Sequence, residues 1–207
     1  METAQELLIK GLAETGANVP GDAVDLFLHY LSELKRWNKA YNLTALKSDR
    51  DIIIKHFLDS LLFYRAFPEA IGDVCDVGSG AGFPGIPIAI VMRDIPVTLV
   101  EPSRKKCAFL RNISRALSLS NISVLESRIE DVEHTHFDIA VTRALFSIDE
   151  FIAKAKHIVR KGGCLIVNKG PKFQEELDKI PASTHFVHIP ATLPLASLQR
   201  HLIRVTV

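Results

Sequence analysis

Apolar residues at helical spacing dominate the first part of the chain. Leu7, Leu8 and Leu12 lie on one face of a helix, and a break from Gly16 to Gly21 follows. A second apolar face runs from Val24 to Trp37, and a third apolar segment covers residues 52–62. The pattern predicts a helical N-terminal extension over residues 1–65, packed on a domain formed by residues 66–207.

The pattern changes after this extension, because short β-rich runs now alternate with helical segments. The expected strands end at Asp76 and cover residues 97–100, 122–125, 137–141 and 164–170; the expected helices cover residues 86–92, 103–119 and 148–159. Residues 185–190 and 201–207 are expected to form two strands that pair antiparallel. Alternating strands and helices predict an α/β fold with a mostly parallel sheet.

A loop with four glycines, DVGSGAGFPG at residues 76–85, follows the first expected strand. Glycine has no Cβ, so this loop can take positive φ angles and a ligand can approach its backbone closely. A second acid, Glu101, ends the next expected strand. Parallel strands joined by a helix place their carboxyl ends at one edge of the sheet, so we expect Glu101 to face the ribose of a ligand.

The glycine loop suits two classes of ligand. Counted from Gly80 it reads G-x-G-x-x-G, a dinucleotide pattern, whereas counted from Asp76 it reads as the acid-x-Gly-x-Gly-x-Gly loop of S-adenosylmethionine enzymes. Three features favour S-adenosylmethionine. An acid precedes the glycines, a long segment precedes this strand–loop–helix unit, and no hydride-transfer site follows it. A glycine-rich turn without a ligand is the third interpretation.

Other candidate residues stand near the ends of further expected elements. Ile129 is expected to cover an adenine, while Glu130 or nearby backbone meets its exocyclic amine. Arg143 follows the strand at 137–141, where it has either an acid partner or a ligand, and its position favours a ligand. His56 and Asp59 share a helix face, which indicates a hydrogen-bonded seam between subdomains or a substrate site; spacing alone favours the seam.

Basic residues gather between residues 35 and 55, beside Asn38, Tyr41 and Asn42. Such a mixture can hold phosphates and stack a base, although composition alone favours a solvated turn. Over the whole chain 25 Lys and Arg balance 24 Asp and Glu, so any electrostatic surface for nucleic acid must be local.

Composition predicts one sizeable core, since 47% of the 207 residues are apolar. The three cysteines lack paired spacing and are expected to be reduced core thiols. His134 and His136 lack further ligands at metal spacing, so we expect both at the surface and no metal. METAQELLIK is not a signal peptide and no apolar run has bilayer length, which predicts a cytoplasmic protein without a membrane anchor.

Several motifs together resemble one family over nearly the whole chain. They are WNKAYNLT (37–44), HFLDS (56–60), DVGSGAGFPGIPIAI (76–90), LVEPSRKKCAFL (99–110), SRIED (127–131), TRA (142–144), NKG (168–170) and RHL (200–202). The sequence is similar to bacterial small-subunit ribosomal RNA guanine-N7 methyltransferases, the glucose-inhibited division protein B family. Lys55 and Pro102 depart from the usual residues at positions that do not touch the cofactor contacts.

The resemblance implies a Rossmann-like class I methyltransferase fold with a seven-stranded sheet, one antiparallel strand and a helical N-terminal extension. It implies S-adenosylmethionine as donor, S-adenosylhomocysteine as product and a guanine of 16S ribosomal RNA as acceptor. The expected partner is 16S ribosomal RNA or the 30S subunit, and the enzyme is expected to be a monomer. The implied cofactor residues are Asp76, Gly78, Gly80, Phe83, Glu101, Ile129, Glu130 and Arg143, and the implied RNA-binding residues are Lys35, Arg36, Asn38, Lys39, Asn42, His56, Lys169 and Arg200.

The residues agree with attack by a ring nitrogen. Guanine N7 carries a free lone pair, so no general base is required and Arg143 is expected to position the reactants, with a hydrogen bond to guanine O6 as one role. Thr142, Arg143 and Ala144 stand where amine methylases carry Asn-Pro-Pro or Asp-Pro-Pro, and no cysteine is placed as a nucleophile. An RNA-binding ribosome-assembly factor with a non-catalytic cofactor pocket and a nicotinamide-dependent oxidoreductase are the alternatives.

Overall fold

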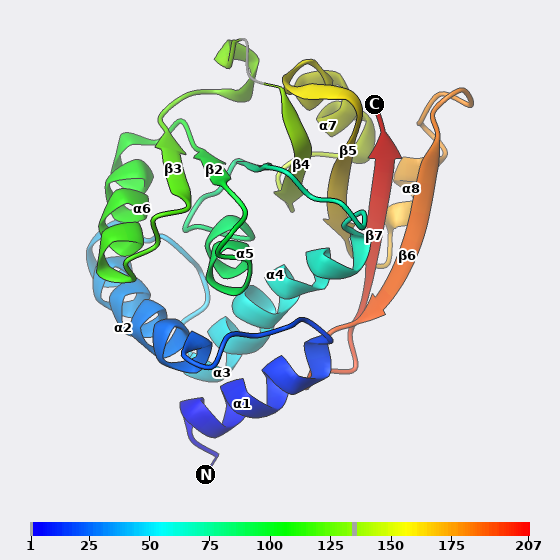
Figure 1. The fold of residues 1–207 in the computed structure, drawn as a ribbon. Helices are drawn as coiled ribbons and strands as arrows, with labels where there is room; N and C mark the ends of the chain where they lie inside the picture. Colours follow the sequence, from blue (N-terminus) through cyan, green and yellow to red (C-terminus); the bar gives the residue numbers. More distant parts are fainter. Residues whose placement is uncertain (1, 134–135) are drawn as a thin grey trace.

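In the computed structural model, which describes residues 2–133 and 136–207, seven strands form one sheet in the order β3-β2-β1-β4-β5-β7-β6 (Figure 1). The first five strands in this order run parallel, and β7 is antiparallel to both of its neighbours. The strands are β1 (Val74–Val77), β2 (Val97–Val100), β3 (Ile122–Leu125), β4 (Phe137–Arg143), β5 (Val159–Lys169), β6 (Phe186–Thr192) and β7 (Gln199–Thr206). The predicted fold class is confirmed.

Helices precede and connect these strands. The N-terminal part contains α1 (Ala4–Thr15), α2 (Ala23–Tyr41) and one unbroken run of helical turns formed by α3 (Asp49–Ile52), η1 (Ile53–Leu58), α4 (Asp59–Leu61) and η2 (Leu62–Ala66). The later helices are α5 (Gly85–Val91), α6 (Arg104–Ala116), η3 (Ile129–Asp131), α7 (Ile148–Ala155), η4 (Lys156–Ile158) and α8 (Phe173–Leu177). Thr3 and Glu6 form a capping box at the start of α1, which satisfies free backbone N–H groups there.

Several predicted boundaries were wrong at the centre of the sheet, and β1 ends at Val77, one residue beyond Asp76. β4 continues to Arg143 rather than Val141, because Thr142 and Arg143 still pair with Val167 and Asn168 of β5. The helix expected to reach Val159 ends at Ala155, and β5 already begins at Val159. Gly163 allows this longer strand, since a Cβ there would lie 2.5 Å from the carbonyl oxygen of Asp138 on the neighbouring strand.

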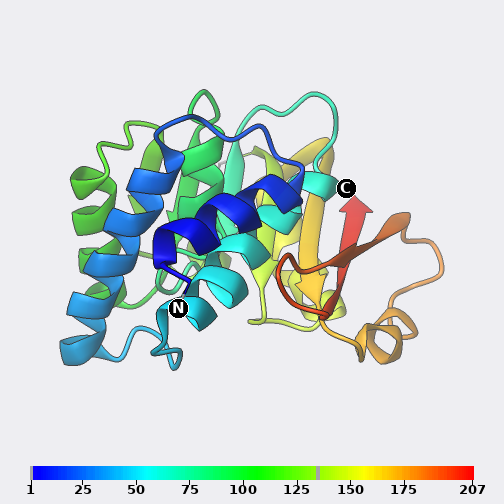
Figure 2. The ribbon, with the colours of Figure 1, turned by 90° about the horizontal axis from the view of Figure 1, so that it is seen from below.

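Side chains of successive strand residues enter two hydrophobic clusters, one on each face of the sheet. One cluster contains the N-terminal helices, α5 and α6; the other contains α7 and Ile129. Figure 2 shows the N-terminal helices, coloured blue to cyan, lying across one face of the sheet. The helical N-terminal part and the sheet therefore share a continuous core.

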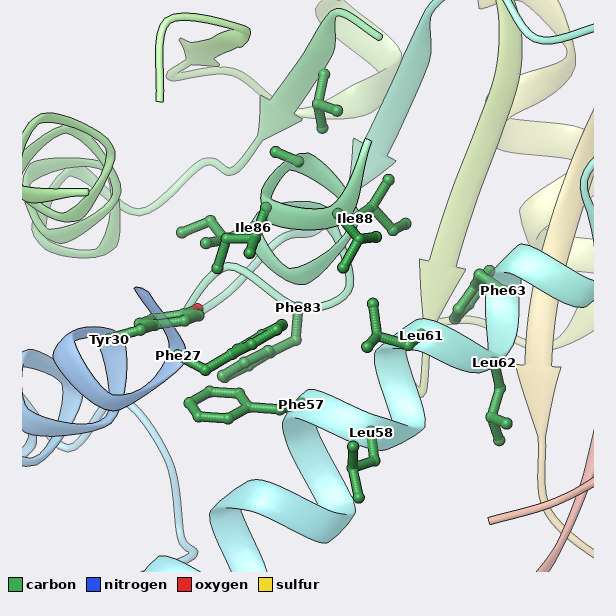
Figure 3. Packing of buried hydrophobic residues seen from close by; sticks show 14 of the residues in the cluster. Phe27, Tyr30, Phe57, Leu58, Leu61, Leu62, Phe63, Phe83, Ile86 and Ile88 are labelled. Carbon is green, nitrogen blue, oxygen red and sulfur yellow. The ribbon is translucent and has the colours of Figure 1, made fainter. Parts of the chain in front are cut away.

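Aromatic rings form the centre of the larger cluster (Figure 3). Phe57 of η1 packs against both Phe27 and Tyr30 of α2, with centroid distances of 5.1 Å, and Tyr30 stacks on Phe83 at 5.4 Å. The hydroxyl of Tyr30 donates a hydrogen bond to the carbonyl oxygen of Ala81, and burial raises the pKa of this phenol well above its usual value. The N-terminal helices thus pack directly on the glycine loop.

All three cysteines are buried and free, as expected. Across residues 2–133 and 136–207, no helix is both long and apolar enough to cross a membrane. The same part of the chain contains no group of three His, Cys, Asp or Glu side chains arranged as metal ligands. His136 is exposed, whereas His134 lies outside the described residues.

We predict that Gly85→Ala destabilises the fold. The added Cβ would lie 2.2 Å from Leu99 Cδ2 and 2.7 Å from Asp76 Oδ2, so the start of α5 must move away from β1 and β2. Overpacking of this kind costs about 1–3 kcal/mol. Gly21→Ala is the control, because its Cβ would meet nothing within 4 Å. Denaturant unfolding measures both; equal stability of the two variants would contradict the prediction.

Candidate functional site

Two buried acids hold the glycine loop in shape at the carboxyl edge of the sheet. Asp76 Oδ2 accepts a hydrogen bond from the Gly85 N–H at 2.9 Å, and Glu101 Oε2 accepts one from the Gly80 N–H at 2.9 Å. The φ angles of Gly78 and Gly80 are +74° and +59°, which glycine takes without strain. A Cβ at Gly80 would meet only the carbonyl oxygen of Gly78, at 3.9 Å, so the loop is open to a ligand there.

The side chain of Glu101 is anchored at the end of β2. Its second oxygen, Oε1, accepts a hydrogen bond from the Ser103 N–H at 2.9 Å, and the residue is 4% exposed. Ile129 is buried in the cluster on the α7 face of the sheet, whereas the Glu130 side chain is exposed and forms an ion pair with Lys154 of α7. Neither residue lines the cavity that the glycine loop opens onto.

A cavity of about 500 Å³ joins the glycine loop to the N-terminal helices and to the ends of β4 and β5. It brings together seven of the residues singled out in the sequence, from segments far apart in the chain: His56, Gly78, Gly80, Phe83, Arg143, Lys169 and Arg200. Leu43, Thr44, Lys55, Asp59, Ser79, Ala81, Ala144, Asn168 and Gly170 complete its lining.

Arg143 lies in the wall of this cavity and binds the N-terminal part through three contacts. Its Nη1 donates to the Lys55 carbonyl oxygen at 2.9 Å and to Asp59 Oδ2 at 3.2 Å, and its Nη2 lies 2.9 Å from His56 Nδ1. The other oxygen of Asp59 accepts a hydrogen bond from Arg200 Nε at 2.7 Å. One buried carboxylate therefore bridges two guanidinium groups.

His56 is held as a neutral imidazole. Burial, and then the charge of Arg143, lower its pKa to about 3. The ring stacks on Phe83 with a centroid distance of 4.4 Å and an interplanar angle of 17°. The pairing of His56 with Asp59 expected from their spacing is replaced by separate contacts of each residue with Arg143. A cation at His56 would have to form beside this guanidinium, which disfavours it.

Lys169 and Asn168 end β5 in different environments. Lys169 Nζ donates to the Phe146 carbonyl oxygen and pairs with Glu176 at 2.8 Å, and Glu176 accepts from the Ile148 N–H, so these side chains fix the segment between β4 and α7. Asn168 is 5% exposed, and within the described part of the chain its Oδ1 has no hydrogen-bond donor.

The basic segment predicted for RNA lies beside the cavity, and some of its members have internal partners. Lys35 pairs with Asp49, Arg36 pairs with Glu33, and the Asn38 amide binds both the N–H and the carbonyl oxygen of Thr44. A second hollow of about 620 Å³ adjoins the first, since Thr44 lines both; Lys35, Asn38, Lys39, Asn42 and Lys47 also line it.

Three residues that line the cavity have contacts there that the sequence did not predict. Asp59 was expected to pair with His56, Asn168 was noted only as part of a motif, and Thr44 ends the WNKAYNLT motif without a proposed role. Their contacts join segments that are distant in the chain, so local spacing could not predict their partners. The position of Asn168 at the end of an apolar strand is the one local clue.

We predict that Asp76 makes folding stability fall as pH rises. Burial raises the pKa of Asp76 to about 7, against an ordinary value of 3.8, so the native state favours its protonated form. Its contribution is complete below pH 4 and is lost as pH rises through 7. The unfolding free energies of the protein and of Asp76→Asn should be measured from pH 4 to 8. As pH rises, the wild-type protein should lose stability relative to the variant. A constant difference would contradict this.

Comparison with protein families and relatives confirms the resemblance seen in the sequence. Residues 24–203 match the family model described as rRNA small subunit methyltransferase G. The ribosomal RNA small subunit methyltransferase G of Nitrosococcus oceani is 39% identical over 203 residues, covering 97% of this chain and 94% of that protein. Its counterpart from Neisseria gonorrhoeae is 34% identical over 200 residues, covering 96% of each chain.

Solved structures show the same fold at low sequence identity. A methyltransferase from Pyrococcus furiosus superposes with a TM-score of 0.62 at 14% identity, covering 86% of this chain and 96% of that one. A SAM dependent methyltransferase from Aquifex aeolicus gives a TM-score of 0.56 at 16% identity, covering 86% and 98%. These similarities support the fold assignment independently of the family model.

Proposed function

Since the chain belongs to the rRNA small subunit methyltransferase G family, we propose that it transfers a methyl group from S-adenosylmethionine to N7 of a guanine in 16S ribosomal RNA. The observation that carries the proposal is the single cavity that joins the glycine loop to Arg143 and His56. A donor bound on the loop and a base bound against the N-terminal helices would meet there.

The residues present fit the cofactor. Gly78 and Gly80 leave the backbone of the loop accessible, Glu101 lies within hydrogen-bond distance of that loop, and Asp76 has an oxygen with no donor in the described residues. In this proposal Phe83 contacts the cofactor, Glu101 holds the ribose hydroxyls, and Ile129 and Glu130 lie at the adenine. S-adenosylmethionine supplies an electrophilic methyl group, and S-adenosylhomocysteine is the product.

The protein's contribution to the chemistry is alignment. Guanine N7 attacks with its own lone pair, so no side chain has to remove a proton, and the neutral His56 is not needed as a base. Holding two reactants in line can lower a barrier by about 7–11 kcal/mol in favourable cases. Arg143 is suited to position the reactants, because its contacts with Lys55, His56 and Asp59 immobilise it in the cavity wall.

The proposed RNA contacts surround the same opening. Lys35, Arg36, Asn38, Lys39, Asn42, His56, Lys169 and Arg200 are assigned to RNA, with residues 1–65 forming one wall and residues 66–207 holding the cofactor. The net charge of +1 provides little general attraction for RNA, so a shaped RNA–protein surface, that of the 30S subunit, is the proposed partner. The protein is proposed to act as a cytoplasmic monomer. The family assignment favours neither the assembly factor nor the nicotinamide oxidoreductase.

Methyl transfer from labelled S-adenosylmethionine tests the proposed function. The acceptors are 16S ribosomal RNA, presented free of protein and in 30S subunits, and the labelled nucleoside is identified after digestion. Label in 7-methylguanosine is the expected result. Cofactor binding without transfer to either acceptor would support the assembly factor instead, and binding of reduced nicotinamide cofactor would support the oxidoreductase.

Arg143→Ala should reduce transfer by roughly a hundredfold, because the contacts that fix Lys55, His56 and Asp59 in the cavity wall are lost and the reactants are no longer held in line. Single-turnover methylation measures this loss, and circular dichroism shows whether the fold is retained. Arg115→Ala, an exposed arginine on α6, is the control and should transfer at the normal rate. Undiminished transfer by Arg143→Ala would remove this residue from the site.

Lys39→Ala combined with Lys47→Ala should weaken RNA binding and flatten its dependence on salt. Both lysines are exposed and line the hollow next to the cavity. Each phosphate contact contributes about 0.7–0.9 to the slope of log K against log salt, so losing two flattens it by roughly 1.5. Lys156→Ala with Lys161→Ala is a charge-matched control near the amino end of β5. An unchanged slope in the first pair would contradict the RNA assignment.

A further inference from the structure

The hydroxyl of Thr44 lies on the wall of the cavity between two groups that approach its oxygen. The Leu46 N–H donates to Thr44 Oγ1 at 3.1 Å, and His56 Nε2 lies 2.7 Å from the same oxygen. The backbone of Thr44 is fixed in turn by the Asn38 side chain, at 2.9 and 3.0 Å. The position of this hydroxyl is therefore set from several sides.

The direction of each hydrogen bond follows from Arg143. A guanidinium group has only donors, so His56 Nδ1, 2.9 Å from Arg143 Nη2, must accept. A neutral imidazole carries one proton, which is then on Nε2. His56 Nε2–H consequently donates to Thr44 Oγ1, and Thr44 cannot donate back to the ring.

Thr44 is left with one unused donor. A hydroxyl accepts two hydrogen bonds and donates one, and both acceptor positions of Thr44 are occupied by Leu46 and His56. Within residues 2–133 and 136–207 the structure gives its proton no acceptor. Because Thr44 lines the cavity, a bound molecule with an acceptor at this point would accept the remaining hydrogen bond of the hydroxyl.

We propose that the Thr44 hydroxyl donates a hydrogen bond to O6 of the target guanine and selects guanine over adenine. This inference rests on the proposed function and names the group that recognises the base. On the edge that contains N7, guanine presents O6, an acceptor, whereas adenine presents an amino group, a donor. A hydroxyl that can only donate matches the first and opposes the second.

Arg143 and His56 are then positioning residues for this recognition. Both terminal nitrogens of Arg143 contact protein acceptors, namely Lys55, Asp59 and His56. Arg143 determines the tautomer of His56, and His56 determines which way the Thr44 proton points. Through the hydrogen bonds from Arg143 to His56 and from His56 to Thr44, the position of the Arg143 guanidinium therefore fixes the orientation of the Thr44 hydroxyl.

The test pairs a variant with a changed base. Thr44→Val removes the hydroxyl at similar shape, Thr44→Ser retains it, and 2-aminopurine placed at the position that the wild-type enzyme methylates removes O6 but retains N7. On normal RNA, single-turnover transfer should fall at least roughly tenfold for Thr44→Val, which loses the hydrogen bond to O6 and leaves the Leu46 N–H and His56 Nε2–H without their acceptor. For Thr44→Ser the fall should be less than about threefold. S-adenosylmethionine affinity should not change.

Combining Thr44→Val with 2-aminopurine distinguishes a loss of base recognition from structural damage to the site. If Thr44 contacts O6, 2-aminopurine slows the wild-type enzyme but slows Thr44→Val little further, so the two losses do not multiply. Multiplying losses, or normal transfer by Thr44→Val, would overturn the inference; Thr44→Ala replaces Thr44→Val if that variant does not fold. A wild-type enzyme that fails to methylate unmodified RNA would instead overturn the proposed function itself.

Discussion

A buried carboxylate, that of Asp59, joins the helical N-terminal part to the ends of β4 and β7. It is 4% exposed and binds Arg143 through one oxygen and Arg200 through the other. Removing one partner of such a buried pair leaves an uncompensated charge, which is strongly unfavourable. The position of Arg143 depends on this carboxylate, and through Arg143 so do the tautomer of His56 and the shape of the cavity.

Charged and neutral side chains line the cavity together, and Asp76 is buried beneath the glycine loop. The positive charge of Arg143 is partly balanced by Asp59, His56 stays neutral, and Asp76 is driven toward its protonated form by burial. A reaction in which a ring nitrogen attacks a cationic methyl donor needs no general base. This architecture orients the reactants rigidly. Packed aromatic rings and hydrogen bonds between the two parts of the chain provide that rigidity.

Local sequence was sufficient to predict the first and last residues of strands that neighbouring residues in the chain delimit. β2 and β3 begin and end at the predicted residues, because each is a short β-rich run between residues that interrupt it: Pro96 and Glu101 for β2, and Asn121 and Glu126 for β3. It was insufficient where a partner strand decides: Thr142 and Arg143 extend β4 only because β5 pairs with them. The basic segment shows the same limit, since composition could not reveal that Asn38 holds the backbone of Thr44.

The sequence by itself determined the glycine loop, its two acids, the parallel sheet and the family, because each depends on residue types at short, regular spacing. Only the tertiary structure decided that Asp59 binds two arginines, that His56 faces Arg143 and Thr44, and that these residues meet the glycine loop in one cavity. These contacts join residues far apart in the chain, and the energy of a buried charge or hydrogen bond depends on the partner that folding brings to it.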